Sequence, residues 1–209
     1  MNQSIQSHED RLAAAAEITA KARQSITEAE ALAADVADLK LRAAGGDLDD
    51  QGAAVLVAKS EKARINSITA PRRQRALDDA TEAEVAVGLE VLKALSDALV
   101  PVEADAAQAA DKLTEALVCP LAAALEEDTV LAREIGVARC SVERGMPGVY
   151  GASVLRERIK NASQTTWGAA HVPGEAALIL GAFDAELAAI RSGTAMLKAT
   201  AKTALKARE

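Results

Sequence analysis

The segment LGAFDAELAAIRSGTAMLKATAKTA, residues 180–204, decides the fold class, because its apolar residues recur at alternating intervals of three and four. The recurring positions are Leu180, Phe183, Leu187, Ile190, Thr194, Leu197, Ala201 and Ala204. This spacing places the side chains along one stripe of an α-helix and is typical of a coiled-coil contact. The sequence therefore predicts a long C-terminal helix that packs lengthwise against another helix.

Two further stripes with the same alternating spacing lie upstream. The N-terminal stripe consists of Ile5, His8, Leu12, Ala15, Thr19, Ala22, Ile26, Ala29, Ala33 and Val36, and the central stripe of Leu92, Leu95, Leu99, Val102, Ala106, Ala109, Leu113 and Ala116. Alanine fills much of both stripes, which allows two helix axes to approach each other closely. The central stripe runs through Pro101, so either a helix kinks there or a new helix begins with Pro101 in its first turn.

The composition favours helix along the whole chain. The 209 residues include 50 alanines and 22 leucines but only one Phe, one Trp and one Tyr, with 12 glycines and 5 prolines. Alanine has the highest helix propensity, and a core without large aromatic rings needs many small contacts between close helices. We therefore predict an all-α fold, an elongated helical bundle with long coiled-coil-like helices, and the composition argues against an all-β fold.

Glycine and proline mark the expected boundaries of these helices. Gly45-Gly46-Asp47 ends a helix predicted over residues 8–44, and Pro71 interrupts the next segment. The clearest turn signal is Gly145 to Gly151, between shorter helices predicted at 128–143 and at 152–162. Ser153 and Gly151 are alternative caps for the second of these helices, which a polar loop at 161–174 follows.

These boundaries give two regions that we expect to pack together as one domain. Residues 1–144 form a long-helix bundle region. Residues 145–209 contain the Gly/Pro turn, the loop and a basic C-terminal heptad helix.

Charge is distributed in blocks, although the formal net charge at pH 7 is −7. Residues 1–58 carry −5 and residues 59–77 carry +5, whereas residues 78–128 carry −11 and residues 129–209 carry +4. Blocks of opposite sign attract each other, either within one folded bundle or between copies of the chain. The sequence leaves both arrangements open.

The basic block raises the question of nucleic-acid binding. Its basic residues are Lys59, Lys62, Arg64, Arg72, Arg73 and Arg75. The block contains no aromatic residue to stack on a base, the chain is acidic overall, and no helix-turn-helix or zinc-knuckle spacing is present. We therefore interpret Arg72, Arg73 and Arg75 as a protein interface that pairs with the acidic run from Asp78 and Asp79, in the same copy or in a neighbour.

Two other groups are candidates for protein contacts. Lys198, Lys202 and Lys206 recur every four residues near the end of the chain. They form either a solvated face, favoured by the helix dipole, or a basic helix that docks on an acidic protein surface. Trp167, the single tryptophan, either fills a gap between helices or anchors an interface.

No motif points to catalysis, to a cofactor or to a metal. His8 and His171 are the only histidines, neither follows a glutamate by three residues, and HExxH, GxSxG, a phosphate loop and GxGxxG are absent. Cys119 and Cys140 have no metal-ligand spacing, and we interpret them as small core residues. We therefore predict a protein that is not an enzyme and that has no catalytic residue, cofactor or bound metal.

The sequence also predicts a cytoplasmic protein, either free or incorporated into a particle or virion. The longest apolar stretches reach eight residues, whereas a membrane span needs about 20, and residues 1–10 lack the pattern of a secretory signal. Two cysteines are compatible with a reducing compartment.

Three hypotheses for function follow. The first is a structural protein that joins copies of itself, or another protein, into a larger assembly such as a virion or scaffold. The alternatives are an amphipathic coat of a hydrophobic surface or granule, and a helical binding module or inhibitor.

Overall fold

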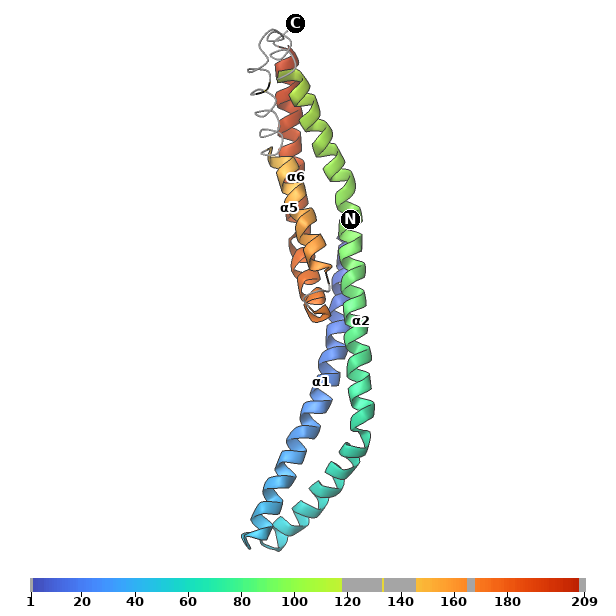
Figure 1. Cartoon of the computed structure of the whole chain (residues 1–209), viewed down its shortest axis with the longest axis vertical. Helices are drawn as coiled ribbons and strands as arrows, with labels where there is room; N and C mark the ends of the chain where they lie inside the picture. Colours follow the sequence, from blue (N-terminus) through green and yellow to red (C-terminus); the bar gives the residue numbers. More distant parts are fainter. Residues whose placement is uncertain (1, 118–132, 134–145, 165–167, 207–209) are drawn as a thin grey trace. The chain divides into compact units, whose positions relative to one another are not determined.

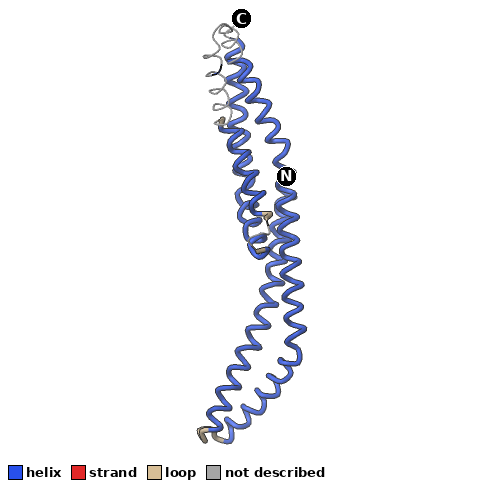
Figure 2. Tube along the Cα trace, in the orientation of Figure 1, coloured by secondary structure: helices blue, strands red, loops and turns tan. Residues whose placement is uncertain are grey.

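The computed structural model describes residues 2–117, 133, 146–164 and 168–206, and in these ranges the predicted all-α fold is confirmed. The elements are α1 (Asn2–Ala44), α2 (Asp50–Leu117), α5 (Pro147–Ala162), the short 3-10 helix η2 (Ala169–His171) and α6 (Val172–Lys206). Helices account for nearly all of the described chain, and the loop that joins α1 to α2 is short (Figure 2).

The chain forms two compact units, Met1–Val87 and Gly88–Glu209. In unit 1, α1 and the first part of α2 lie side by side as a helical hairpin (Figure 1). Unit 2 contains the rest of α2 together with α5, η2 and α6. This division falls within α2, whereas the glycine and proline signals of the sequence predicted a boundary between residues 144 and 145.

A tight turn joins the two helices of unit 1, at the place where Gly45-Gly46-Asp47 predicts it. Gly46 has a φ of 80°, the Asp47 amide donates to the Arg42 carbonyl at 3.0 Å, and the Gly46 amide donates to the Ala43 carbonyl at 3.2 Å. This is a Schellman ending, in which glycine takes the left-handed conformation at low cost. The Asp49 carboxylate then caps α2, because its Oδ1 accepts the Gly52 amide at 2.7 Å.

Unit 1 buries few side chains. Leu12, Val36, Thr19 and Ala80 are its buried residues in the described range. The Thr19 hydroxyl donates to the Ala80 carbonyl at 3.2 Å, and Lys59 Nζ lies 2.8 Å from Asp35 Oδ2, so polar contacts connect α1 to α2 as well. A two-helix hairpin has only one packed face, and most of the surface of both helices is left exposed.

Unit 2 has a larger apolar core. The C-terminal stripe is buried from Leu180 to Ala201 at each of its seven positions in that range, and the central stripe is buried at seven of eight. Ala109, Leu113, Leu197 and Ala201 pack with Met146 in one cluster. The two strongest heptad patterns in the sequence thus mark the core of this unit.

Helix α2 continues through both of its prolines. No new helix begins at Pro101, and Pro71 does not end the helix either. Both prolines are exposed, and Pro71 lines a groove between α1 and α2.

The start of α5 differs from the prediction. The helix begins at Pro147, so Ser153 and Gly151 lie inside it and neither is a cap; Met146 precedes the helix without a side-chain cap. Proline suits the first helical turn, and Gly148 and Gly151 pack against Thr194 and Ile190 of α6. Gly148 and Gly151, interpreted from the sequence as part of a turn, therefore serve close helix packing.

The predicted loop at 161–174 is shorter, because α6 begins at Val172 and includes Pro173 and Gly174 in its first turn. The helix predicted at 128–143, and both cysteines, lie outside the described residues apart from Arg133, which is helical.

Candidate functional site

The three arginines of the predicted interface separate onto two faces of α2. Arg73 faces α1 and lines a groove of about 510 Å³ between the two helices of unit 1. Its Nη2 donates to Asn66 Oδ1 at 2.6 Å, while its Nη1 is buried and has no hydrogen-bond partner among the described residues. Much of the groove is lined by alanine, including Ala29, Ala33 and Ala63.

We expect Arg73→Leu to raise the free energy of unfolding by about 1 kcal/mol, because a buried donor without an acceptor is costly and leucine adds apolar contact in the groove. Thermal unfolding of the full chain, followed by circular dichroism, measures the change. The matched control is Arg23→Leu at an exposed position of α1 outside the groove, for which we expect a change within about 0.5 kcal/mol. A stability of Arg73→Leu equal to or below that of the unmodified chain would contradict this account.

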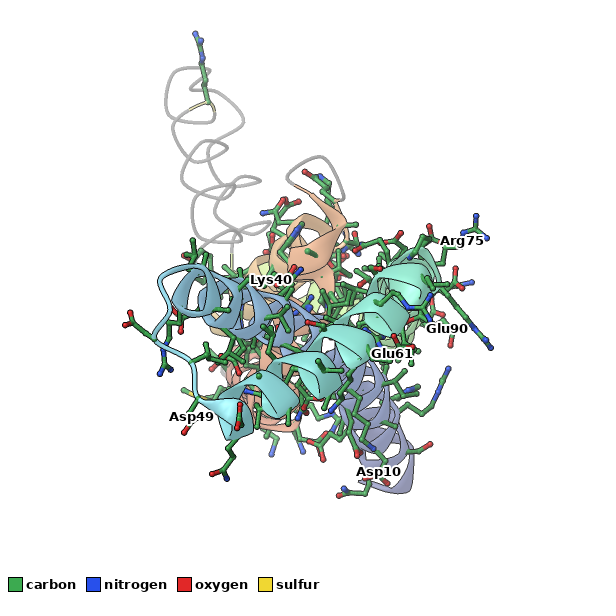
Figure 3. The ribbon with its side chains drawn as sticks, turned by 90° about the horizontal axis from the view of Figure 1, so that it is seen from below. Asp10, Lys40, Asp49, Glu61, Arg75 and Glu90 are labelled. Carbon is green, nitrogen blue, oxygen red and sulfur yellow. The ribbon has the colours of Figure 1, made fainter. Side chains whose placement is uncertain are left out.

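Arg72 and Arg75 lie on the opposite side of α2, where α1 does not cover it. They are exposed, and Figure 3 shows the labelled Arg75 side chain pointing away from the ribbon. Ile65 and Ile68 precede them at helical spacing, and their side chains are 51% and 68% exposed. Large apolar side chains and arginines together are typical of a protein contact surface.

Acidic side chains continue the same face toward the end of unit 1. Asp79 and Glu82 follow Arg75 at intervals of four and three residues, and both are exposed. Residues three and four apart are neighbours on a helix, so the series shares one face. We call this the outer face of α2, and its members are Ile65, Ile68, Arg72, Arg75, Asp79, Glu82 and Ala86.

The charges of the outer face have no partners of opposite sign among the described residues. In the described part of the structure, Arg72, Arg75, Asp79 and Glu82 make no ion pair, so the predicted pairing with Asp78 and Asp79 does not occur within one copy. Asp78 instead accepts a hydrogen bond from Gln74 at 2.9 Å. Ion pairs between residues four apart on a helix are stronger when the acidic residue comes first, whereas here Arg75 precedes Asp79.

Neighbouring charges do have partners. Arg64 Nη2 lies 2.8 Å from Glu61 Oε1, and this hydrogen bond raises the pKa of Arg64. In unit 2, Arg156 pairs with Glu103 on α2 and Arg158 with Glu186 on α6. Basic and acidic side chains of unit 2 therefore pair within one chain. On the outer face of unit 1, by contrast, basic and acidic side chains have no ion-pair partner among the described residues.

The three C-terminal lysines also differ in their contacts. Lys198 Nζ lies 2.7 and 2.8 Å from the two carboxylate oxygens of Asp105, so it links α6 to α2. Lys202 lines a shallow groove with Lys112 and Glu115, and Lys206 is exposed. Trp167 lies outside the described residues. Tyr150 is exposed near the start of α5.

The histidines lie in different environments. The Nδ1 atom of His171 is hydrogen-bonded to the Gly168 carbonyl, and the Nδ1 atom of His8 is buried and has no hydrogen-bond partner in the described part of the chain. In the described ranges, no group of three His, Cys, Asp or Glu side chains is close enough to hold a metal ion. None of the described helices has the length and apolar character needed to cross a bilayer.

The sequence analysis did not identify three members of the outer face, Ile65, Ile68 and Glu82, and it named Asp79 only as an ion-pair partner of the arginines. A signal was present, because the series runs from residue 65 to residue 86 at alternating intervals of three and four. The same segment of α2 carries a second face that contacts α1, and only the structure distinguishes the covered face from the open one.

Comparisons with known proteins identify no relative of this chain. No protein-family model, no curated protein and no solved structure matches it.

Proposed function

We propose that this chain is a non-enzymatic structural protein that assembles with copies of itself through unit 1. The observation that supports this proposal is the outer face of α2, where exposed isoleucines lie beside unpaired charges of both signs. A face with two arginines followed by two carboxylates is complementary to a second copy of itself.

The shallow packing of unit 1 also favours assembly. A hairpin with four buried residues in its described range gains little stability from its own core, and helices such as these are stabilised mainly by packing of their apolar faces. A second hairpin that covers Ile65 and Ile68 would add such packing. We place this assembly in the cytoplasm or within a larger particle, such as a virion or scaffold.

Light scattering of the full chain at low and high salt tests the proposal. We expect a mass above the 21.6 kDa of one chain at low salt, which falls toward that value as salt rises. The reason is that the screening length shortens from about 30 Å at 0.01 M to about 3 Å at 1 M salt. A protein that stays monomeric at both salt concentrations, over a wide range of protein concentration, would refute self-assembly.

A further inference from the structure

We infer that two copies pair through the outer face of α2 in antiparallel orientation, with a two-fold axis beside Leu77. This inference rests on the proposed self-assembly and specifies its partner and register. Arg72 of one copy then lies opposite Glu82 of the second copy, and Arg75 lies opposite Asp79. Each charge pair occurs twice, because a two-fold interface repeats every contact.

The apolar residues fit the same register. Ile68 is nine residues before Leu77 and Ala86 is nine residues after it, so antiparallel pairing brings them opposite each other. Ile68 is 68% exposed in the single chain, and Ala86 is exposed as well. A large side chain opposite alanine allows the two helices to approach while the arginines reach the facing carboxylates.

A parallel arrangement in register lacks this complementarity. It would place Arg72 against the second Arg72 and Glu82 against the second Glu82, and like charges across a contact are repulsive. With the two copies in register, the outer face is thus complementary to a reversed copy and not to a copy in the same direction. Residues 72, 75, 79 and 82 are exposed and have no ion-pair partner in the described chain, so no internal pair must break.

Variants with reversed charges test the proposed antiparallel register. We expect Arg72→Glu to weaken association about tenfold or more, because two attractive pairs become repulsive. The double variant Arg72→Glu with Glu82→Arg restores both pairs in reversed polarity and should recover association close to that of the unmodified chain. Arg23→Glu on α1 is the matched control, since Arg23 is exposed and the change in net charge is the same. We expect no weakening there.

Spin labels measure the orientation directly, in a chain with Cys119→Ser and Cys140→Ser. Each copy carries one label, and the two copies are related by an axis beside Leu77. Along the helix axis, the two labels at Ala76→Cys are therefore separated by the length of two residues, and the two labels at Ala58→Cys by the length of 38 residues. At a rise of about 1.5 Å per residue, these separations along the axis are about 3 Å and about 57 Å. Both positions are exposed and lie outside the outer face as defined above.

The outcomes separate the inference from the proposed function. Close labels at residue 76, distant labels at residue 58 and rescue by the double variant support the antiparallel register. An oligomer with close labels at both positions, or one that the double variant fails to restore, overturns the register and leaves self-assembly intact. A chain that remains monomeric in every form overturns both.

Discussion

Phe183→Ala should lower the free energy of unfolding by about 3 to 5 kcal/mol, the largest single effect that we expect in this protein. Phe183 is 1% exposed on α6 and is the largest fully buried side chain in the described structure. Its replacement leaves a cavity that smaller neighbours fill only in part. Because natural domains are stable by about 5 to 15 kcal/mol, the loss is a large fraction of the total.

Thermal or urea unfolding of the full chain measures this effect. The matched control is Leu178→Ala on the same helix, where the side chain is 67% exposed. For this variant we expect a change within about 0.5 kcal/mol, because the leucine contributes little to the core. Equal losses for the two variants would show that Phe183 has no special role in the packing of unit 2.

The sequence was sufficient to predict the two long helical faces that form the described core of unit 2. The central and C-terminal stripes predicted which faces of α2 and α6 are buried, because their apolar residues keep a strict alternation over several turns. The turn at Gly46 was also predictable, since glycine there adopts a left-handed conformation that other residues avoid.

The candidate site was predictable only in part. Arg72, Arg73 and Arg75 are adjacent in sequence, but a rotation of about 100° per residue directs Arg73 toward α1 and the other two away from it. Charge clustering in sequence contains no information about which side of a helix is covered. For the same reason the pairing of Lys198 with Asp105, which are 93 residues apart, required the structure.

The glycines near the start of α5 show a second limit of sequence reasoning. Gly148 and Gly151 match a turn as well as they match a close helix contact, because both need the absence of a side chain. In the structure, a Cβ atom at Gly148 would lie 2.8 Å from Thr194 Oγ1, 3.1 Å from the Thr194 amide nitrogen and 3.3 Å from the Ile190 carbonyl oxygen. Two of these three neighbours are backbone atoms and cannot rotate away.

We therefore expect Gly148→Ala to lower the free energy of unfolding by about 1 to 3 kcal/mol, because α5 and α6 must move apart to accept the methyl group. The Thr194 hydroxyl cannot relieve the contact at no cost, since it donates to the Ile190 carbonyl at 2.8 Å and a β-branched side chain is stiff. Gly181→Ala on α6 is the control of opposite sign. No atom lies within 4 Å of a Cβ there, so alanine should stabilise the helix by up to about 1 kcal/mol. Chemical unfolding of both variants measures the difference, and a stabilising Gly148→Ala would contradict a close contact between α5 and α6.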